Sequence, residues 1–340
     1  DIARALATPP RATPNAAATP ADAADLAAYR PLERDPLVID YRGRRILAMA
    51  PPSSGGGVLA EILGVLSAFD LARTGRDGPT WPHLLADTMK AAFADRATFY
   101  GDPAFTKMPL ARLTSAGHAA AIRAKLDHQR AVPSAAFAPA AEAAIDAGTS
   151  HISVVDADGN AAALTTSVNT GFGAGLSVPG RDIVLNNTMD DFSAQPGKPN
   201  AFDLVGSHAN AIAPGKRPLS SMTPVIVLEG GEVELVAGAS GGPLIITSTL
   251  QTLVGVVDFG LTVDDAVAAP RLHHQWIPEV LLIEEGFPEK TAATLSRIGH
   301  RVVPMPAKAS VQAVEVRGHG SRRTLHATSD PRKGGLPAGY

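Results

Sequence analysis

Thr149 is the residue in this chain that could become a nucleophile with its own base. It opens the run Thr149-Ser150-His151 directly after Gly148, and an alternating β-type pattern follows. If the Gly148–Thr149 bond is cut, Thr149 carries both a hydroxyl and a free α-amine, whose unperturbed pKa is about 7.7–8.0. The amine could take the hydroxyl proton, directly or through one water, so that the hydroxyl attacks an acyl group. The alternative is that Thr149 is simply the first residue of a strand.

Two polar clusters after Thr149 could position it and a substrate amine. Ser167 and Asn169 end the return strand of a predicted hairpin, which brings a hydroxyl and an amide back beside Thr149. The next strand ends in Asp190 and Asp191, where a carboxylate could hold a substrate ammonium. Such an aspartate pair, taken alone, is more often a turn and a helix N-cap.

Two further clusters offer groups that could bind anions. Ser220 and Ser221 place two hydroxyls in one turn, which suits a substrate carboxylate. Gly241 and Gly242 stand between a predicted strand and a predicted buried helix. Glycine lets backbone N–H groups crowd a small anion, and the helix adds its positive end. An oxyanion hole requires these properties, although each cluster, taken alone, is more often a tight turn.

A nucleophile elbow is the rival motif. The segment Gly238 to Gly242 fits G-x-S-x-G, with a predicted strand before it and a predicted helix after it. Asp258 and either His273 or His274 could complete a triad. The rest of the chain, however, does not alternate strands and helices as that fold requires. We interpret His273-His274-Gln275-Trp276 as a packed structural patch rather than a metal site.

Composition excludes several functional classes. The 340 residues are 45% hydrophobic and 19% charged, with a net charge of −3, which gives no sign of nucleic-acid or anionic-membrane binding. The lack of cysteine excludes disulfides, thiolate catalysis and cysteine-based zinc sites. The ten histidines are scattered, and no apolar run is long enough to predict a membrane span. The start lacks both an initiator Met and a recognisable leader, so we expect a piece of a longer protein that a secretion signal could have preceded.

The predicted elements are helices first and strands later. Two strands flank Arg42-Gly43 within 38–49. Helices are predicted at 57–73, 82–99, 244–259, 263–269 and 288–298, with a further helical stretch within 103–130. Strands are predicted at 152–155, 162–168, 183–185, 225–228, 233–237, 302–303, 311–316 and 325–327. This order indicates an α+β fold around mostly antiparallel sheets.

The chain divides at Thr149 into two parts that we expect to form one folded unit. Residues 1–25 are rich in Ala, Pro and Thr and are predicted to be a flexible tail or linker. Residues 26–148 are mainly helical and end in an Ala/Pro-rich stretch, 131–148, predicted to be an exposed, cleavable connector. Residues 149–340 carry most of the strands.

Several long motifs in the right order resemble the gamma-glutamyltransferase family of N-terminal nucleophile hydrolases. The resemblance spans about residues 22–340. The motifs are Tyr41-Arg42-Gly43, Pro51 to Gly56, Thr149-Ser150-His151, Asn186 to Ser193, Lys216 to Met222, Pro270 to Trp276, and Asp330 to Tyr340.

The resemblance implies a fold, an activity and a location. The fold is a four-layer αββα sandwich, and the chain cleaves itself before Thr149 to give a heterodimer of the two pieces. The activity is transfer of a γ-glutamyl group from glutathione-like donors to water or an amino acid, in the periplasm or outside the cell. By position, Thr149 is the nucleophile, Ser167 stands where the family has a Thr that assists it, and Gly241 and Gly242 match the oxyanion-hole pair. The resemblance calls for neither a metal ion nor an organic cofactor.

The resemblance also assigns the donor site and shows departures from the family pattern. Asn169 and Asp191 match residues that hold the donor α-amine, and Ser220 and Ser221 match those that hold its α-carboxylate. Thr188 stands where Glu or Gln usually helps to bind the amine, which leaves room for other acyl groups, such as glutaryl side chains of cephalosporins.

Two further departures concern the lid and the large subunit. The loop 195–207 matches a lid found in many bacterial members, but Phe202 replaces its usual Tyr and cannot make that hydrogen bond. The first half of the family's large subunit, which supplies an Arg for the donor carboxylate, is absent from this chain. The alternatives are therefore an acylase that uses the same nucleophile, or an unprocessed chain without activity.

Overall fold

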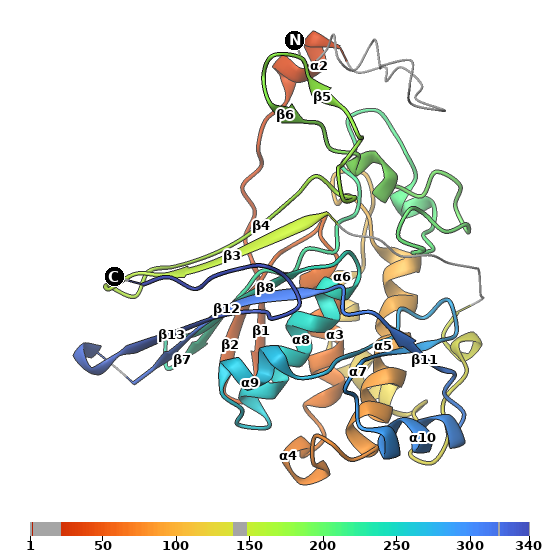
Figure 1. Cartoon of the computed structure of the whole chain (residues 1–340). Helices are drawn as coiled ribbons and strands as arrows, with labels where there is room; N and C mark the ends of the chain where they lie inside the picture. Colours follow the sequence, from red (N-terminus) through yellow and green to blue (C-terminus); the bar gives the residue numbers. More distant parts are fainter. Residues whose placement is uncertain (1, 3–21, 139–147, 319, 340) are drawn as a thin grey trace.

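The computed structural model of the chain describes residues 2, 22–138, 148–318 and 320–339 (Figure 1). The helices are α2 (Ala23–Ala28), α3 (Gly55–Leu66), α4 (Leu71–Thr74), α5 (Thr80–Phe99), α6 (Leu110–Leu113), α7 (Ala116–Arg123), α8 (Leu244–Val257), α9 (Val263–Ala268) and α10 (Glu289–Arg297). The strands are β1 (Leu37–Tyr41), β2 (Arg44–Ala48), β3 (Thr149–Val155), β4 (Ala161–Ser167), β5 (Ser177–Val178), β6 (Ile183–Val184), β7 (Val225–Glu229), β8 (Glu232–Ser240), β9 (Leu272–His273), β10 (Leu281–Glu284), β11 (Val302–Met305), β12 (Ser310–Arg317) and β13 (Thr324–Ser329).

A six-stranded antiparallel sheet forms the centre of the fold. Its order is β1-β2-β7-β8-β12-β13, so strands from both ends of the chain lie in one sheet. The β1–β2 hairpin turns at Arg42 and Gly43, whose φ angles of 52° and 77° are both positive, as a two-residue type I′ turn requires. The shorter sheet β3–β4 packs on β8 and β12, above the large sheet in Figure 1. Two β layers therefore face each other.

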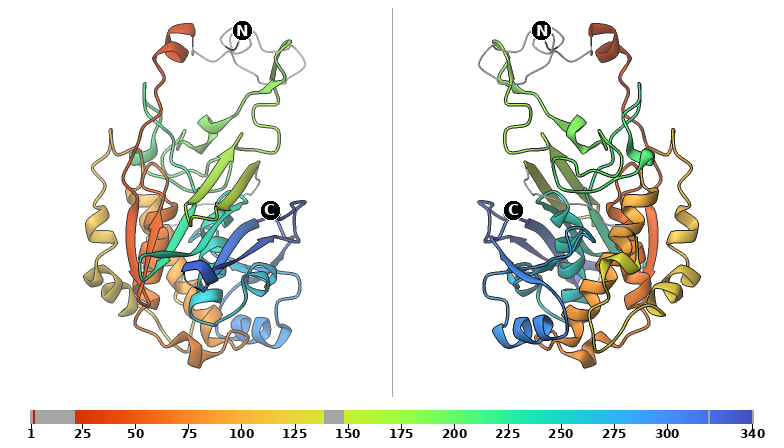
Figure 2. Two further views of the ribbon diagram at one scale, coloured as in Figure 1. Left: turned by 90° about the vertical axis from the view of Figure 1, so that its left-hand side faces the viewer. Right: turned by 90° about the vertical axis from the view of Figure 1, so that its right-hand side faces the viewer.

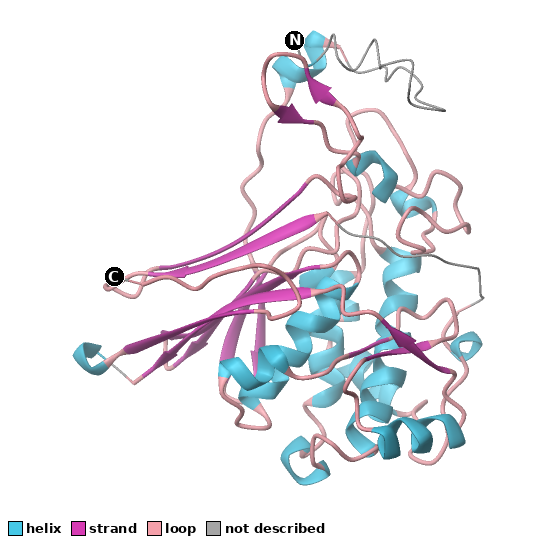
Figure 3. Ribbon diagram, in the orientation of Figure 1, coloured by secondary structure: helices cyan, strands magenta, loops and turns pink. Residues whose placement is uncertain are grey.

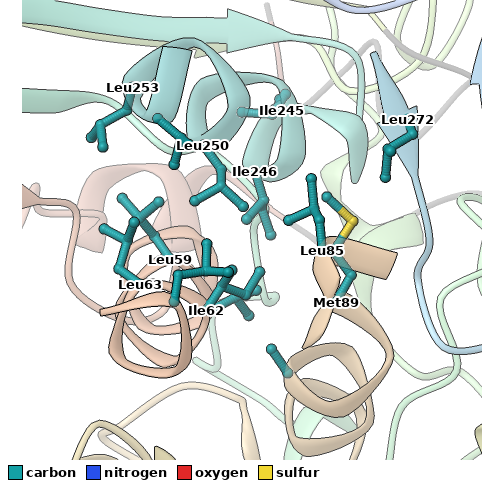
Figure 4. Close-up of a cluster of buried hydrophobic side chains, with 14 of the residues drawn as sticks. Leu59, Ile62, Leu63, Leu85, Met89, Ile245, Ile246, Leu250, Leu253 and Leu272 are labelled. Carbon is teal, nitrogen blue, oxygen red and sulfur yellow. The ribbon is translucent and has the colours of Figure 1, made fainter. Parts of the chain in front are cut away.

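Helices α3, α8 and α9 pack on the other face of the large sheet, and α5 packs against α3 (Figures 1 and 2). Their apolar side chains meet in one continuous core, shown in Figure 4. The labelled members are Leu59, Ile62, Leu63, Leu85, Met89, Ile245, Ile246, Leu250, Leu253 and Leu272. α3 and α8 are buried over most of their length because both sequences are apolar on nearly every side.

The predicted α+β class is confirmed, and the described residues supply a helical layer and two β layers of the expected sandwich (Figure 3). The outward face of β3–β4 exposes Ile152, Val154 and Leu164, each at least half accessible to solvent. Among the described residues, no helix combines the length and apolarity that a membrane crossing requires.

Two predicted helical segments differ from the structure. The helix predicted at 57–73 is two helices, α3 and α4, because Asp70 accepts a hydrogen bond from the Arg73 amide and starts a new helix. The stretch 103–130 holds only the short helices α6 and α7.

The described part of the connector predicted at 131–148 alternates, with Val132 and Ser134 buried and Pro133, Ala135 and Ala136 exposed. The Ser134 hydroxyl donates to the Trp276 carbonyl at 2.7 Å, and the Trp276 indole N–H donates to the Ser134 carbonyl at 3.1 Å. Residues 139–147 lie outside the described residues, as does most of the predicted tail at 1–25, whose described end enters α2 at Asp22.

Candidate active site

The β3–β4 hairpin places Thr149 against the large sheet. The alternation along β3 turns Thr149 and His151 inward, while Ser150 points to solvent. Thr149 pairs directly with Ser167 across the hairpin, and their hydroxyl oxygens are 2.9 Å apart. The Thr149 side chain is therefore buried, with its hydroxyl held by a second hydroxyl. The hairpin predicted from the sequence is confirmed, together with the return of Ser167 to Thr149.

The peptide between Gly148 and Thr149 is held on both sides. The Gly148 carbonyl oxygen accepts from the Ser167 hydroxyl at 3.2 Å and from the Val168 amide at 3.3 Å. The Gly148 amide donates to the Asn169 carbonyl at 2.6 Å. Any side chain at position 148 would collide with the Thr170 carbonyl, so glycine is required there. Two donors at one carbonyl oxygen can stabilise negative charge that develops on it.

Lys333 connects Thr149 to the glycine turn that ends β8. Its ammonium donates to the Thr149 carbonyl at 2.9 Å and to the Ser240 hydroxyl at 3.2 Å. Gly241 and Gly242, which follow, have φ angles of 135° and 57° that other residues rarely adopt. Within the described part of the chain, their amide N–H groups have no hydrogen-bond acceptor. The turn therefore offers two free donors close to the nucleophile's strand.

A second group of side chains gathers where α3 begins. The Ser54 amide and hydroxyl both donate to the Ser220 carbonyl at 2.8 Å. Arg96 of α5 is buried, and its guanidinium donates to the Ser54 hydroxyl at 2.9 Å and to the Ser221 hydroxyl at 3.2 Å. The predicted serine pair is thus joined to a cation that the sequence analysis did not select.

Asp191 shares the electrostatic environment of Arg96. Burial raises the pKa of Asp191 to about 7, with Asp190 adding to the rise and Arg96 opposing it. Burial lowers the pKa of Arg96 to about 10, against the attraction of Asp191. The Asp191 carbonyl is fixed by the side-chain amides of Asn200 and Asn210, at 3.2 and 2.8 Å. A carboxylate and a guanidinium in one buried site suit a ligand that carries both an ammonium and a carboxylate.

Asn169 links the two groups of residues. Its positive φ of 83° turns the chain after β4, and its side-chain amide donates to the Asn187 carbonyl at 3.1 Å. Asn187 leads into the short 3₁₀ helix Thr188–Asp191, which carries two of the predicted donor-site residues. The Thr188 amide donates to the Asn186 side chain at 3.0 Å.

The predicted lid is tied to the body of the protein. Phe202 is buried, and its amide donates to the Asn200 side chain at 2.9 Å. The Gln275 side chain donates to the Phe202 carbonyl at 3.4 Å. The loop 195–207 is therefore tied to the rest of the protein through the Phe202 carbonyl and through the Ser207 hydroxyl, which donates to the Thr98 carbonyl at 2.8 Å, rather than through an aromatic hydroxyl.

Comparison with known proteins identifies the family of the chain. The family model described as gamma-glutamyltranspeptidase matches residues 11–340. The chain belongs to the gamma-glutamyltranspeptidase family. It is 45% identical over 318 residues to the glutathione hydrolase proenzyme of Escherichia coli K12, which covers 93% of this chain and 54% of that relative.

Two solved structures support the family fold. A threonine-to-alanine mutant of Helicobacter pylori gamma-glutamyltranspeptidase is 43% identical with a TM-score of 0.53, over 54% of this chain and 99% of that chain. A cephalosporin acylase from Bacillus halodurans is 26% identical with a TM-score of 0.76, over 92% of this chain and 54% of that chain. The chain spans about half the length of the curated relatives it matches.

The nucleophile-elbow alternative is wrong for this member of the gamma-glutamyltranspeptidase family. Asp258 accepts from the Tyr41 hydroxyl at 2.8 Å and pairs with Arg42 at 2.9 Å, so both of its carboxylate oxygens are already engaged. The two ring nitrogens of His273 form hydrogen bonds with the side chains of Thr247 and Gln275, both at 2.9 Å. Burial also lowers the pKa of His273 to about 4. The patch around His273 is packed and structural, as the sequence predicted.

The sequence analysis missed three residues of the site: Ser54, Arg96 and Lys333. Ser54 did carry a signal, because Ser and Gly before an apolar run mark a helix entrance. Arg96 lies within a helix that is buried over most of its length and Lys333 near the C-terminus, and neither stands in a spacing that indicates chemistry. Arg96 contacts Ser221, 125 residues away in the sequence, and Lys333 contacts Thr149, 184 residues away.

Proposed function

We propose that the protein containing this chain cleaves itself before Thr149 and then transfers or hydrolyses γ-glutamyl groups of glutathione-like donors. The observation that carries the proposal is the arrangement around the Gly148–Thr149 peptide. The Thr149 hydroxyl lies 2.9 Å from the Ser167 hydroxyl, which is itself 3.2 Å from the Gly148 carbonyl oxygen. Membership in the gamma-glutamyltranspeptidase family supports the proposal.

Self-cleavage follows from these contacts. The Thr149 Oγ attacks the Gly148 carbonyl carbon, and its proton passes toward the amide nitrogen, with Ser167 in position to relay it. Collapse of the intermediate breaks the C–N bond and leaves Gly148 esterified to the Thr149 Oγ. Water hydrolyses the ester, giving a Gly148 carboxylate and a free Thr149 amine. The Val168 amide and Ser167 hydroxyl stabilise the oxyanion formed in the first step.

The same Thr149 then acts on the donor. Its free amine takes the hydroxyl proton while the Oγ attacks the γ-amide carbonyl, and the amides of Gly241 and Gly242 stabilise the oxyanion. The leaving amine departs with a proton, and an acyl-enzyme remains. Water or the amine of an amino acid resolves the acyl-enzyme and restores the Thr149 hydroxyl.

The proposed donor site takes the glutamyl end of the substrate. Asp191 and Asn169 hold the α-ammonium, and Ser220 and Ser221 hold the α-carboxylate. The position of Arg96 supports this orientation, because its guanidinium is bonded to the Ser221 hydroxyl within a buried site. Thr188 adds no charge to this site.

The two fragments, 26–148 and 149–340, stay together as a heterodimer in this proposal. β2 from the first fragment pairs with β7 from the second in one sheet, and this ladder supports the pairing. The exposed apolar face of β3–β4 suits packing against a further part of the longer protein. The loop 195–207 serves as a lid, and the protein works in the periplasm or outside the cell, as the family resemblance implies.

A glutaryl or cephalosporin-type acylase is the second candidate. The favouring observation is Thr188, which offers a hydroxyl in place of an acidic or amide group beside the proposed ammonium site. The similarity to a cephalosporin acylase structure also supports it. Both candidates use the same nucleophile and differ in the acyl group.

The deciding experiment compares two substrates with one control variant. Release of p-nitroaniline from a γ-glutamyl anilide, faster than hydrolysis of a matched glutaryl amide, supports the first candidate, and the reverse order supports the second. Thr149→Ala should abolish both activities and leave a single band on denaturing electrophoresis. Appreciable turnover by that variant would refute the nucleophile assignment, and Ser240→Ala should retain activity.

A further inference from the structure

A cluster of two carboxylates and an imidazole lies in the helical layer, apart from the nucleophile. Glu61 comes from α3, Asp95 from α5 and His118 from α7, three helices of which α3 contacts both others (Figure 1). The His118 Nε2 is 2.7 Å from the Asp95 Oδ2 and 3.8 Å from the Glu61 Oε2. The three potential ligand atoms all lie within 4.8 Å of one another.

Glu61 is the unusual member of this cluster. Its side chain is buried, and its Oε1 accepts from the Tyr100 hydroxyl at 2.8 Å. Its Oε2 has no hydrogen-bond partner among the described residues, although it faces His118 and Asp95. A buried carboxylate oxygen without a partner is costly, so a positively charged group between Glu61, His118 and Asp95 would be stabilised there.

We propose that Glu61, Asp95 and His118 bind a divalent transition-metal ion of the Zn²⁺ type. Carboxylate oxygen and imidazole nitrogen are normal zinc ligands, at about 2.0–2.2 Å, and the two carboxylates balance the charge of the dication. Tetrahedral ligands at that distance are about 3.3 Å apart. The His118 Nε2 is 2.7 Å from the Asp95 oxygen and 3.8 Å from the Glu61 oxygen, on either side of this value. Small side-chain rotations would therefore bring the three atoms to ligand distances.

The surroundings of the cluster fit an ion. The Tyr100 hydroxyl orients Glu61 from behind, as groups around metal ligands commonly do. The side chains of His118 and Asp95 keep 14% and 20% of their accessibility, which gives an ion an entry path and leaves room for a water ligand. The guanidinium of Arg112 acts on Glu61 from a distance and so opposes a cation there, but among the described residues it forms no ion pair with the cluster.

A second cluster of similar composition shows what is special about this one. His83, Asp87 and His300 also lie close together, with the His83 Nδ1 2.8 Å from the His300 Nε2. The buried Lys90 ammonium is 3.0 Å from the Asp87 Oδ1. An ammonium that close neutralises the carboxylate and repels a dication. The Glu61 cluster has no lysine among its described ion pairs.

The site lies behind the residues that we propose to bind the donor. Asp95 immediately precedes Arg96, and α3, which carries Glu61, begins directly after Ser54. An ion held by α3, α5 and α7 would fix the helices from which two donor-site side chains project. The proposal concerns ion binding alone, so it holds or fails independently of the γ-glutamyl activity.

Calorimetric titration of the EDTA-treated, desalted protein with ZnCl₂ tests the site. We expect saturable binding of one Zn²⁺ at the cluster and a rise in the melting temperature with Zn²⁺. Glu61→Gln, which keeps the shape and the hydrogen bond from Tyr100, and His118→Ala should each weaken binding at least about tenfold, since even outer partners of metal ligands have effects of 10–100-fold. His326→Ala, which removes an exposed histidine, is the matched control and should bind as the parent does.

Anomalous scattering at the zinc edge from soaked crystals locates the ion without reliance on the variants. A peak between the three side chains supports the proposal. Absence of saturable binding, equal affinity in the parent and Glu61→Gln proteins, or a peak only at other histidines would overturn it. Melting curves without metal establish that each variant is folded before its affinity is compared.

Discussion

Replacing Ser167 by Ala should slow self-cleavage strongly and destabilise the protein by a similar or smaller free energy. The Ser167 hydroxyl is 2.9 Å from the Thr149 hydroxyl and 3.2 Å from the Gly148 carbonyl oxygen, so one substitution removes contacts to both the nucleophile and the carbonyl that it attacks. Loss of one oxyanion donor costs about 10²–10³ in rate, or about 2.7–4 kcal/mol. The Val168 amide remains at 3.3 Å, so we expect residual cleavage rather than none.

The stability cost of the same change has a different source. The Asn169 amide donates to the Ser167 hydroxyl at 2.8 Å and would lose its acceptor. An unsatisfied buried donor costs about 1–3 kcal/mol. Unfolding curves of the variant measure this loss directly, and the cleavage rates should be compared at a temperature where both proteins are folded.

Timed denaturing electrophoresis after cell-free synthesis is the suitable assay. The parent protein should yield two fragments that meet at the Gly148–Thr149 junction, and Ser167→Ala should yield them about 10²–10³ times more slowly. Ser167→Thr restores a hydroxyl and should cleave at close to the parent rate. Thr149→Ala, which lacks the nucleophile, is the uncleaved control. Cleavage by folded Ser167→Ala at the parent rate would refute the reasoning.

Four further changes test the site and the fold. Lys333→Met removes the ammonium that bridges β3 and β8, and should lower kcat about tenfold or more in p-nitroaniline release. Arg96→Met leaves Asp191 without its nearby cation and should lower kcat/KM about a hundredfold or more. If the Asp191 carboxylate holds the donor ammonium, protonation removes that charge, so kcat/KM should fall as the pH drops below about 7, and Asp191→Asn should leave only the fall caused by protonation of the Thr149 amine. Asp330→Asn breaks a buried pair with Arg271, 2.7 Å apart, and should destabilise the fold by about 3–5 kcal/mol in urea titrations.

The nucleophile hairpin could be predicted from the sequence because its determinants are local. Alternation along 149–155 and 161–167, with a tight turn between them, fixes which side chains face inward. That register places Thr149 opposite Ser167. The hairpin at Arg42-Gly43 in the large sheet is also determined locally, by a two-residue turn. Both of its residues have positive φ in the structure.

The donor site could be predicted only in part, because it depends on contacts between distant segments. Ser220 and Ser221 were found as a hydroxyl-rich turn, but Arg96 reaches them from a helix 125 residues earlier. A helical pattern shows that one face is buried without showing what a buried arginine meets. The packed part of the connector was missed for a similar reason. Its small residues carry no apolar pattern, and Ser134 is held by hydrogen bonds to Trp276, 142 residues later.

Cleavage before Thr149 would cut the chain without dividing the fold. β1 and β2 precede the cut, and five residue pairs join β2 to β7, which follows it. Three ion pairs also join the two parts, from Arg44 to Glu229 at 3.1 Å, from Arg44 to Glu234 at 2.8 Å and from Arg42 to Asp258 at 2.9 Å. The proposed donor site crosses the same boundary, with Arg96 on one side and Ser221 on the other. A free Thr149 amine can therefore form within a site that is already assembled, because the contacts that hold the site do not depend on the bond that breaks.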